Sequence, residues 1–449
     1  MRLGILASHP IQYHAPWFRG LAKRVDLEVF FAHRQTAQGQ ADGGFGVAFD
    51  WDVDLLSGYQ HRFLKNVSSR PGVNHFTGCD TPEIVDIIRK SLVRSPVVRG
   101  PWPQPFDAFI VSGWQLKCYW QAVRACRRAR VPVLVRGDSQ LLTPRSPLKR
   151  IAKEIVHRFL VRQFQGFLYV GQRNRDYLKH YGALDNRLFF VPHLVDNDWF
   201  NEKAEIARKQ RAEIRKQWGI PEDAFCLLFC GKFIPKKRPL DLVAAARLLS
   251  PPNSPLSAPR SMHPAIHLLF VGSGELGAQL RARSRVVFDA EAAVRSPEVS
   301  GPVVSGPVVR SPVVSGLVGS GPPSASFTGF LNQSEMSRAY VAADVLVLPS
   351  ISETWGLVVN EAMACGLPAV VSDAAGCAPD LIEAGKTGFT FPAGDPAQLA
   401  QRLASLSEMK QHGHDFRPAL AEKMRTYCVA SAVSGTLEAV ETFAAKRLA

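Results

Sequence analysis

The residues of this chain best suited to chemistry are two glutamates and a group of lysines. Glu353 and Glu361 are separated by seven residues, and Lys232 and Lys237 lie in a strongly basic loop upstream of them. Carboxylates accept hydrogen bonds from hydroxyl groups, and ammonium groups neutralise phosphates as point charges. Together, these residue types could hold a ligand that carries both sugar hydroxyls and a diphosphate.

The elements around the glutamates place them where ligands bind. The apolar run 342–348 predicts a buried strand, Gly356 opens a helix-like stretch, and residues 366–368 close it. We therefore expect Glu353 in the loop at the carboxyl end of a strand, and Glu361 further along the following helix. Ligands of open α/β sheets bind at this edge, and the N-terminus of a helix favours an anion.

Each of these features also has a simpler explanation. The segment 231–239, taken alone, is best explained as a solvated basic loop. A glutamate is usually solvated on a loop or a helix, although the small and apolar neighbours Ala362 and Met363 disfavour this for Glu361. The glycine turn that contains Gly274 is of a kind common to all α/β proteins.

Strand-like and helix-like runs alternate along nearly the whole chain, which indicates a parallel α/β fold. Strands are expected at residues 3–7, 27–31, 108–111, 131–135, 166–170, 188–191, 226–230, 266–271, 326–330, 345–348 and 369–372. Helices are expected at residues 116–130, 150–164, 239–249, 274–283, 333–342 and 430–448. Two successive sets of these units predict two Rossmann-like domains that face each other across a cleft.

The predicted domains are an N-terminal domain, residues 1–200, and a C-terminal domain, residues 201–430. A final helix in residues 431–449 is expected to cross back to the first domain. The boundary is placed after the polar segment 196–198, where a second series of strands and helices begins.

Three segments rich in proline, serine and glycine interrupt the pattern. They lie at about 93–105, 250–264 and 291–325, and parts of the first and third nearly repeat each other. Frequent proline prevents helices and interrupts strand ladders, so we expect disordered surface insertions. A proline-rich docking ligand is the alternative, based on a single Pro-x-x-P match at Pro252 to Pro255.

The composition is that of a basic globular protein. The chain has 449 residues, 46% hydrophobic, with a net charge of +15. This charge favours phosphates, nucleotides, anionic membranes or nucleic acid as partners, although solubility alone explains it equally well. The eight cysteines show no disulfide or metal-binding spacing, which fits a reducing cytoplasm.

The sequence also predicts where the protein resides. The apolar stretch 3–8 is too short for a signal peptide. No apolar run reaches the roughly 18 residues that a membrane span needs. We expect a cytoplasmic protein, with peripheral attachment to the inner membrane face as a further possibility.

In its second half the chain resembles the GT-B fold glycosyltransferases, specifically the large retaining family 4. The family frame of Pro-Ser, Glu, Gly and Glu-Ala-Met-Ala-x-Gly-x-Pro is matched between residues 342 and 388. The family's Gly-Arg/Lys…Lys loop is matched by Gly231, Lys232 and Lys237. The resemblance covers roughly residues 191–396 apart from the insertions, and the whole frame is far more specific than the spacing of its two glutamates.

The resemblance implies a donor site for a nucleotide-diphosphate sugar. Glu361 would accept hydrogen bonds from the ribose hydroxyls, and Glu353 would contact the transferred sugar. The catalytic residues implied are Glu353, Lys232 and Lys237, with the lysines stabilising the diphosphate leaving group. The other donor contacts implied are Thr354, Trp355, Gly356, Leu357, Gly274 and Phe330. Transfer of a hexose would retain anomeric configuration without a metal or a cofactor, as in polysaccharide or glycolipid synthesis.

The first half matches the family less well. Its first loop has the letters Ser-His-Pro-Ile-Gln-Tyr instead of the paired glycines common in the family, and it resembles a subgroup that begins in this way. His9 and Gln12 of this loop are candidates for contact with the donor or with a carbohydrate or lipid-linked acceptor. Arg136 or Asp138 stands where many relatives have a histidine that faces the donor sugar. Trp114 could stack on a sugar, or it could belong to the core.

Other readings of the chain remain. The Asp-x-Asp pattern of metal-dependent transferases occurs at Asp50 and Asp52 and again at 196–198, and in both places we expect a surface or turn role. A nucleotide-sugar epimerase of the same fold is one alternative function. A non-enzymatic protein that binds nucleic acid or an anionic membrane is another, although no nucleic-acid module is recognised and we expect no nucleic-acid partner.

Overall fold

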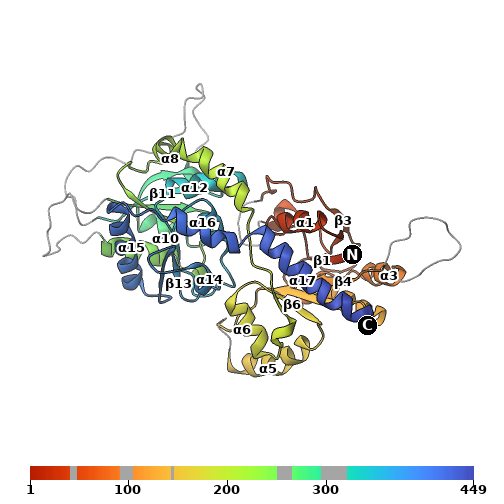
Figure 1. Ribbon diagram of the computed structural model, residues 1–449. Helices are drawn as coiled ribbons and strands as arrows, with labels where there is room; N and C mark the ends of the chain where they lie inside the picture. The colour runs from red at the N-terminus through yellow and green to blue at the C-terminus, as the bar shows by residue number, and fades with distance from the viewer. Residues whose placement is uncertain (41–47, 92–104, 143–145, 250–264, 295–320, 449) are drawn as a thin grey trace. The chain divides into compact units, whose positions relative to one another are not determined.

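The computed structural model describes residues 1–40, 48–91, 105–142, 146–249, 265–294 and 321–448. The chain divides into two compact units, each built on one sheet of seven strands (Figure 1). Unit 1 comprises residues 1–36, 53–196 and 426–449, and unit 2 comprises residues 37–52 and 197–425. All strand pairs are parallel, so the predicted α/β class with two Rossmann-like domains is confirmed.

The sheet of unit 1 has the strand order β3-β2-β1-β4-β5-β6-β7. Its strands are β1 (Arg2–Ala7), β2 (Asp26–Phe31), β3 (Gln60–Phe63), β4 (Ala108–Val111), β5 (Val133–Gly137), β6 (Gly166–Tyr169) and β7 (Leu188–Phe190). Its helices are α1 (Ala15–Ala22), α3 (Glu83–Lys90), α4 (Lys117–Ala129), α5 (Pro147–Val161), α6 (Gln172–His180) and α17 (Val429–Leu448), with single turns η2 (Phe76–Gly78) and η3 (Asp185–Arg187).

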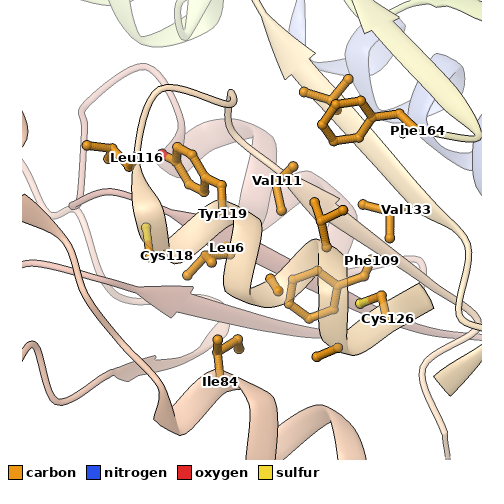
Figure 2. Packing of buried hydrophobic residues seen from close by; sticks show 14 of the residues in the cluster. Leu6, Ile84, Phe109, Val111, Leu116, Cys118, Tyr119, Cys126, Val133 and Phe164 are labelled. Carbon is orange, nitrogen blue, oxygen red and sulfur yellow. The ribbon is translucent and has the colours of Figure 1, made fainter. Parts of the chain in front are cut away.

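Two hydrophobic clusters cover the two faces of this sheet. On one face, side chains of α3, α4 and α6 pack on β4 and β5, and Figure 2 shows part of this cluster around Phe109 and Tyr119. On the other face, α1 and α17 pack together, and the buried Trp17 donates to the Thr436 hydroxyl at 3.1 Å. The strands are apolar on both faces because both faces are covered.

The sheet of unit 2 has the order β10-β11-β9-β8-β12-β13-β14. Its strands are β8 (Phe225–Cys230), β9 (Ile266–Val271), β10 (Arg285–Asp289), β11 (Ser324–Gly329), β12 (Val345–Leu348), β13 (Ala369–Ser372) and β14 (Gly388–Phe391). Its helices are α2 (Ala37–Gln40), α7 (Asn197–Arg208), α8 (Arg211–Gln217), α9 (Pro239–Leu249), α10 (Gly277–Ala282), α11 (Ala290–Val294), α12 (Gln333–Ala342), α13 (Leu357–Ala364), α14 (Ala378–Leu381), α15 (Pro396–Gln411) and α16 (Arg417–Thr426), with a single turn η4 (Pro235–Lys237).

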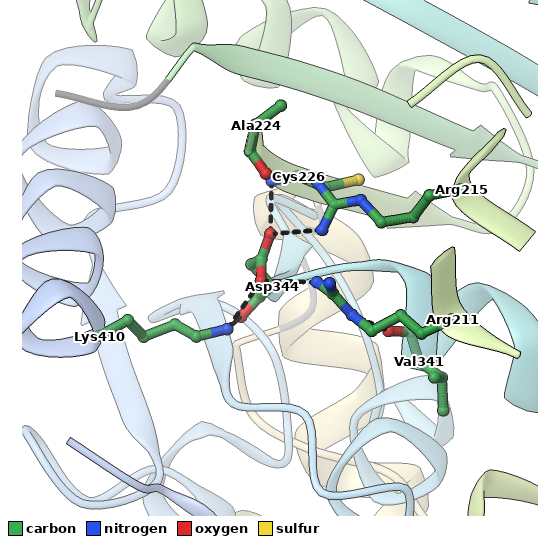
Figure 3. A network of polar contacts seen from close by, with 7 residues as sticks. All are labelled: Arg211, Arg215, Ala224, Cys226, Val341, Asp344 and Lys410. Carbon is green, nitrogen blue, oxygen red and sulfur yellow. Dashed lines mark hydrogen bonds and ion pairs between the residues drawn. The ribbon is translucent and has the colours of Figure 1, made fainter. Parts of the chain in front are cut away.

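A buried carboxylate fixes the amino edge of this sheet. Asp344, just before β12, accepts from Cys226 N at 2.8 Å and pairs with Lys410 at 2.9 Å and Arg211 at 3.1 Å (Figure 3). The buried Arg215 lies 3.5 Å away. Burial alone would raise the pKa of Asp344, but Lys410, Cys226 N and Arg211 together hold it below its usual value. This cluster joins strands β8 and β12 to helices α8 and α15.

The structure corrects several expected boundaries. The helix expected at 150–164 is α5, which starts at Pro147 because proline is favoured at the first helical position. The helix expected at 274–283 begins only at Gly277, and the segment before it is a loop. Strands β3, β10 and β14 were not predicted, because their residues are only partly apolar.

The predicted insertions 93–105, 250–264 and 291–325 lie wholly or mostly outside the described residues. The insertion expected at 291–325 was too long at both ends, since α11 reaches Val294 and β11 already begins at Ser324. Among the described helices, none combines the length and the apolar character that crossing a membrane requires.

Candidate functional site

The carboxyl edge of the unit 2 sheet gathers the residues that the sequence singled out. Strands β9, β8, β12 and β13 are neighbours and parallel, so the loops that follow them all leave the sheet at this edge. These loops are the lysine loop (residues 231–238), the glycine loop (272–276), the glutamate loop (349–356) and the segment 373–377.

The glycine loop supports the lysine loop from one side. Phe233 N donates to Ser273 O at 2.8 Å, and Leu276 N donates to Phe233 O at 2.9 Å. Gly274 has a φ of +147°, and a Cβ there would lie 2.8 Å from Phe233 N. Only glycine lets the two loops approach this closely, so Gly274 has a structural role in addition to any ligand contact.

The glutamate loop supports the lysine loop from the other side. Ile351 N donates to Lys236 O at 3.0 Å, and the ammonium of Lys237 forms an ion pair with the Glu353 carboxylate. The pKa of the half-buried Lys232 is lowered, first by burial and then by the neighbouring charges of Lys237 and Lys236. Of the predicted catalytic residues, Lys237 and Glu353 are thus in direct contact, and Lys232 lies close to the positive charges of Lys236 and Lys237.

Hydrogen bonds orient the backbone of the glutamate loop. Its carbonyls face the segment 373–377, since Gly376 N donates to Glu353 O at 2.9 Å and Cys377 N donates to Trp355 O at 3.0 Å. The ring of Trp355 is buried, and its Nε1 donates to Asn360 Oδ1 at 2.8 Å. Trp355 therefore anchors the loop to α13.

The first turn of α13 points backbone donors at this edge. Gly356 precedes the helix with a φ of +108°, a conformation that favours glycine. Within the described part of the chain, the N–H groups of Thr354, Gly356 and Leu357 donate no hydrogen bond. Unsatisfied N–H groups at a helix start are a ready site for an anion.

Glu361 lies in α13 with 4% of its surface exposed. Tyr340 of α12 donates its hydroxyl to Glu361 Oε2. Burial, and then the charge of Glu361, raise the pKa of the Cys230 thiol, which places the carboxylate beside the end of β8. Glu361 is therefore a buried and oriented acceptor beside the carboxyl end of β8.

Phe330, which follows β11, contacts a segment from far upstream in the chain. Its ring lies 4.3 Å from that of Phe49. In the same segment, the Asp50 carbonyl accepts from Asn332 Nδ2 at 2.7 Å, and the Asp52 carboxylate accepts from Ser334 N at 3.2 Å. The Asp-x-Asp pattern thus supplies a contact to the start of α12, in agreement with the surface role expected for it.

The candidates of unit 1 lie at the carboxyl edge of its own sheet. His9 follows β1, and burial lowers its pKa to about 4. Arg136 of β5 is 6% exposed, lies 5.0 Å above the Trp17 ring and donates to Pro192 O at 3.0 Å. Burial lowers the pKa of Arg136 to about 10, and Asp138 partly opposes this.

Two histidines extend this group of unit 1. His193 Nε2 lies 3.9 Å from Asp138 Oδ2, and the half-buried His14 directly precedes α1. Burial, and then the charge of Arg136, lower the pKa of His14; burial also lowers that of His193, although its contact with Asp138 opposes this. Gln12 is half-buried in the turn between β1 and α1.

Trp114 packs mainly inside unit 1. Its ring lies 5.8 Å from that of His157 and 6.3 Å from that of Tyr177. It also lines a small cavity of about 80 Å³ together with Ser112 and Asp138. These ring contacts favour the core role expected as one alternative for Trp114. The residue also borders the cavity.

Sequence patterns missed the partners of the predicted residues. Tyr340, Asn360 and His193 contact Glu361, Trp355 and Asp138 respectively. Tyr340 offered no signal, because its spacing from Glu361 matches no local motif. For His193 the sequence did offer a signal, because this residue closely follows β7 at the same sheet edge as the other candidates. Among the described residues, no three His, Cys, Asp or Glu side chains gather closely enough to hold a metal ion.

The fold is that of GT-B glycosyltransferases. HepE of Anabaena in complex with UDP-glucose has a TM-score of 0.60 at 16% identity, covering 98% of this chain and 100% of that one. Sucrose-phosphate synthase of Thermosynechococcus elongatus has a TM-score of 0.59 at 17% identity, covering 99% and 100%. At such low identities these likenesses show the fold alone.

Sequence comparison points to the same class. Residues 322–426, which contain both glutamates, match the profile of the family described as glycosyl transferases group 1. A sulfoquinovosyl transferase of Arabidopsis thaliana is 43% identical over 106 residues, 23% of this chain and 21% of that protein. A D-inositol 3-phosphate glycosyltransferase of Thermomonospora curvata is 26% identical over 301 residues, 66% of this chain and 60% of that protein. The chain thus spans less than two thirds of each of these relatives.

Proposed function

We propose that this protein is a retaining glycosyltransferase that uses a nucleotide-diphosphate sugar. The observation that carries the proposal is the convergence of Lys232, Lys237, Glu353 and Glu361 at one sheet edge, beside the N-terminus of α13. In this arrangement cations and backbone donors serve a diphosphate, and two carboxylates serve hydroxyl groups. The match to glycosyl transferases group 1 and the UDP-glucose complex of HepE support the same class.

The geometry suggests a role for each residue. Glu361, oriented by Tyr340, accepts hydrogen bonds from the ribose. The diphosphate competes with Glu353 for the ammonium of Lys237, and the released carboxylate accepts from the donor sugar. Lys232 and the N–H groups of α13 hold the remaining phosphate oxygens.

The reaction exchanges one bond at the anomeric carbon for another. The bond from that carbon to the diphosphate oxygen breaks, and a bond to the acceptor oxygen forms on the same face. The proton of the acceptor hydroxyl passes to the departing diphosphate. Negative charge grows on the leaving group, and the two lysines with the helix terminus stabilise it without a metal or cofactor.

The acceptor belongs to the proposal as well. We assign it to unit 1, where His9, Gln12, Trp114 and Asp138 follow strands of the sheet and Arg136 lies near the carboxyl end of β5. A carbohydrate or lipid-linked acceptor, as in cell-surface polysaccharide or glycolipid synthesis by family 4 enzymes, fits these polar and aromatic residues. A cytoplasmic protein in peripheral contact with an anionic membrane fits the net charge of +15.

A nucleotide-sugar screen tests the proposal. Thermal unfolding is measured with UDP-glucose, GDP-mannose and ADP-glucose, and the best donor is then assayed for transfer to added glycans and lipid-linked sugars. One donor at about 100 times its Kd stabilises the protein by about 2.7 kcal/mol. Absence of stabilisation by every nucleotide sugar would contradict a donor site. Conversion of the donor sugar without an acceptor would instead indicate an epimerase.

A further inference from the structure

Helix α5 of unit 1 presents its apolar residues to the outside. Ile155 is 71% exposed, and Ile151 and Phe159 are each 62% exposed, whereas Lys153 of the same helix is buried. Burial normally selects the opposite arrangement, with lysine outside and isoleucine inside. The outward apolar face therefore needs an explanation beyond the packing of this unit.

Specific contacts hold α5 in this orientation. The Lys153 ammonium lies 4.5 Å from the centre of the Tyr177 ring. His157 Nδ1 lies 2.5 Å from the Tyr177 hydroxyl, and Val161 is part of the core cluster. Because polar and aromatic groups fix the inner face, rotation of the helix would not bury the isoleucines without breaking these contacts.

The exposed side chains form a continuous stripe. Ile151, Ile155 and Phe159 follow each other at four-residue intervals, with Val156 beside them at 50% exposure. Over eight residues the stripe runs for about 12 Å along the helix. Six of the thirteen large apolar side chains that are exposed in the described residues fall between residues 141 and 159. Such clustering, unlike scattered exposed residues, marks an interaction surface.

The charges beside the stripe are positive. Arg158 is 61% exposed at its side chain, and Arg162 is exposed as well. The acidic residue of the helix, Glu154, is engaged by His180 at 2.9 Å and by Arg158 at 3.6 Å.

This charge pattern selects one kind of partner. A second copy of the same face would bring like charges together. A convex helix offers no groove for an incoming peptide helix. An apolar stripe with a basic border is suited to the interface of a bilayer, where apolar side chains enter the acyl boundary and arginines meet anionic headgroups.

We propose that α5 is a membrane-docking helix that inserts Ile151, Ile155, Val156 and Phe159 into the surface of an anionic bilayer. Arg158 and Arg162 contact the lipid phosphates. This surface rests on the peripheral contact included in the proposed function and gives it a location, but it does not depend on the transfer reaction. Binding to vesicles and binding to a nucleotide sugar are therefore separate measurements.

Vesicle sedimentation tests the proposal with the full chain. The wild-type protein is expected to partition onto equimolar phosphatidylglycerol and phosphatidylcholine vesicles, and less onto pure phosphatidylcholine. The double variant Ile155→Gln, Phe159→Gln is expected to lose at least about tenfold in partition coefficient, because two inserted apolar side chains are removed. Leu248→Gln is the matched control, since Leu248 is 54% exposed on α9 of unit 2; its partitioning is expected to stay that of the wild type.

Three results would overturn this assignment. The wild type fails to bind anionic vesicles, the double variant binds them as well as the wild type, or light scattering shows a dimer that the double variant dissociates. Thermal unfolding with the best nucleotide sugar is measured on the same samples. If the wild type is stabilised by a nucleotide sugar but fails to bind anionic vesicles, the docking helix alone is refuted. If the wild type binds the vesicles but no nucleotide sugar stabilises it, the donor site alone is refuted.

Discussion

The two edges of the unit 2 sheet both gather charged residues, but they satisfy them in different ways. At the amino edge, Asp344 is surrounded by Lys410, Arg211, Arg215 and a backbone N–H within the protein itself. At the carboxyl edge, Lys237 pairs with Glu353, and the positive charges of Lys232 and Lys236 lie close to Lys237 in the same loop. The same strand, β12, thus connects a site completed by the fold to a site that a ligand would complete.

This difference separates stability from function. A buried carboxylate with three cationic neighbours holds elements together and has no room for a ligand. A part-buried ion pair beside the N-terminus of α13 is able to exchange one partner for a phosphate. Substitutions at the amino edge should therefore change stability, and substitutions at the carboxyl edge should change binding and turnover.

The largest effect is expected for Asp344→Asn. Loss of the carboxylate leaves the buried Arg215 and the partly exposed Lys410 without their counter-charge, so the free energy of unfolding should fall by about 3–5 kcal/mol. Urea titration followed by tryptophan fluorescence measures this. The control is Asp415→Asn, whose exposed pair with Arg417 should contribute little. Equal effects of the two substitutions would remove the contrast between the edges.

Lys237→Met should come next and should act on turnover. Removing a group that stabilises the leaving diphosphate is expected to lower kcat by about 100- to 1000-fold, with unfolding nearly unchanged. The transfer assay with the best donor measures it. Lys236→Met is the matched control, because Lys236 lies in the same loop but is exposed. If both lysine variants keep wild-type kcat, the leaving-group role of the loop is wrong.

Glu361→Gln should weaken donor affinity by about 10- to 100-fold, because a neutral amide replaces a carboxylate that accepts charge-assisted bonds. Calorimetric titration with the nucleotide sugar gives the Kd. Tyr340→Phe, which removes the hydrogen bond that orients Glu361, should give a smaller loss in the same direction. If the Glu361→Gln protein has an unchanged Kd, this carboxylate does not bind the donor and has only a structural role.

The smallest effect concerns His267 at the amino edge. Its ring nitrogens lie 3.0 Å from Ser324 Oγ and 2.9 Å from Ser326 Oγ, and burial lowers its pKa to about 3. The unfolded chain, with a histidine pKa of about 6.5, binds a proton first as pH falls, so stability is present above pH 6.5 and declines toward pH 3. His267→Gln should flatten this decline by about 2 kcal/mol between pH 6.5 and 5.

Thermal and urea unfolding at several pH values measure the His267 contribution. His412→Gln is the control, because His412 is exposed at the end of α15. An identical pH dependence in wild type and His267→Gln would mean that protonation of this histidine does not oppose folding.

The contrast between the edges also shows how far the sequence could be interpreted. Apolar runs identified β9, β12 and β13 with their observed bounds, because strands buried on both faces are almost continuously apolar. The frame around Glu353 and Glu361 located the carboxyl edge. The ion pair from Lys237 to Glu353 joins segments far apart in the chain, so no local pattern could predict it.

The candidates of unit 1 were harder to interpret from sequence. His9, Arg136 and Trp114 are single residues at or after the carboxyl ends of different strands, with no spacing that relates them. Their grouping with His14 and His193 depends on the order of strands in the sheet. The apolar side of α5 was also hidden, since periodicity identifies an amphipathic helix without showing which side faces the core.

The most direct test of the central claim is a crystal structure of the protein with the nucleoside diphosphate of its best donor. The account predicts phosphates within hydrogen-bond distance of Lys232, Lys237 and the first N–H groups of α13, with the ribose hydroxyls on Glu361. A nucleotide bound elsewhere, with the pair of Lys237 and Glu353 intact, would contradict it.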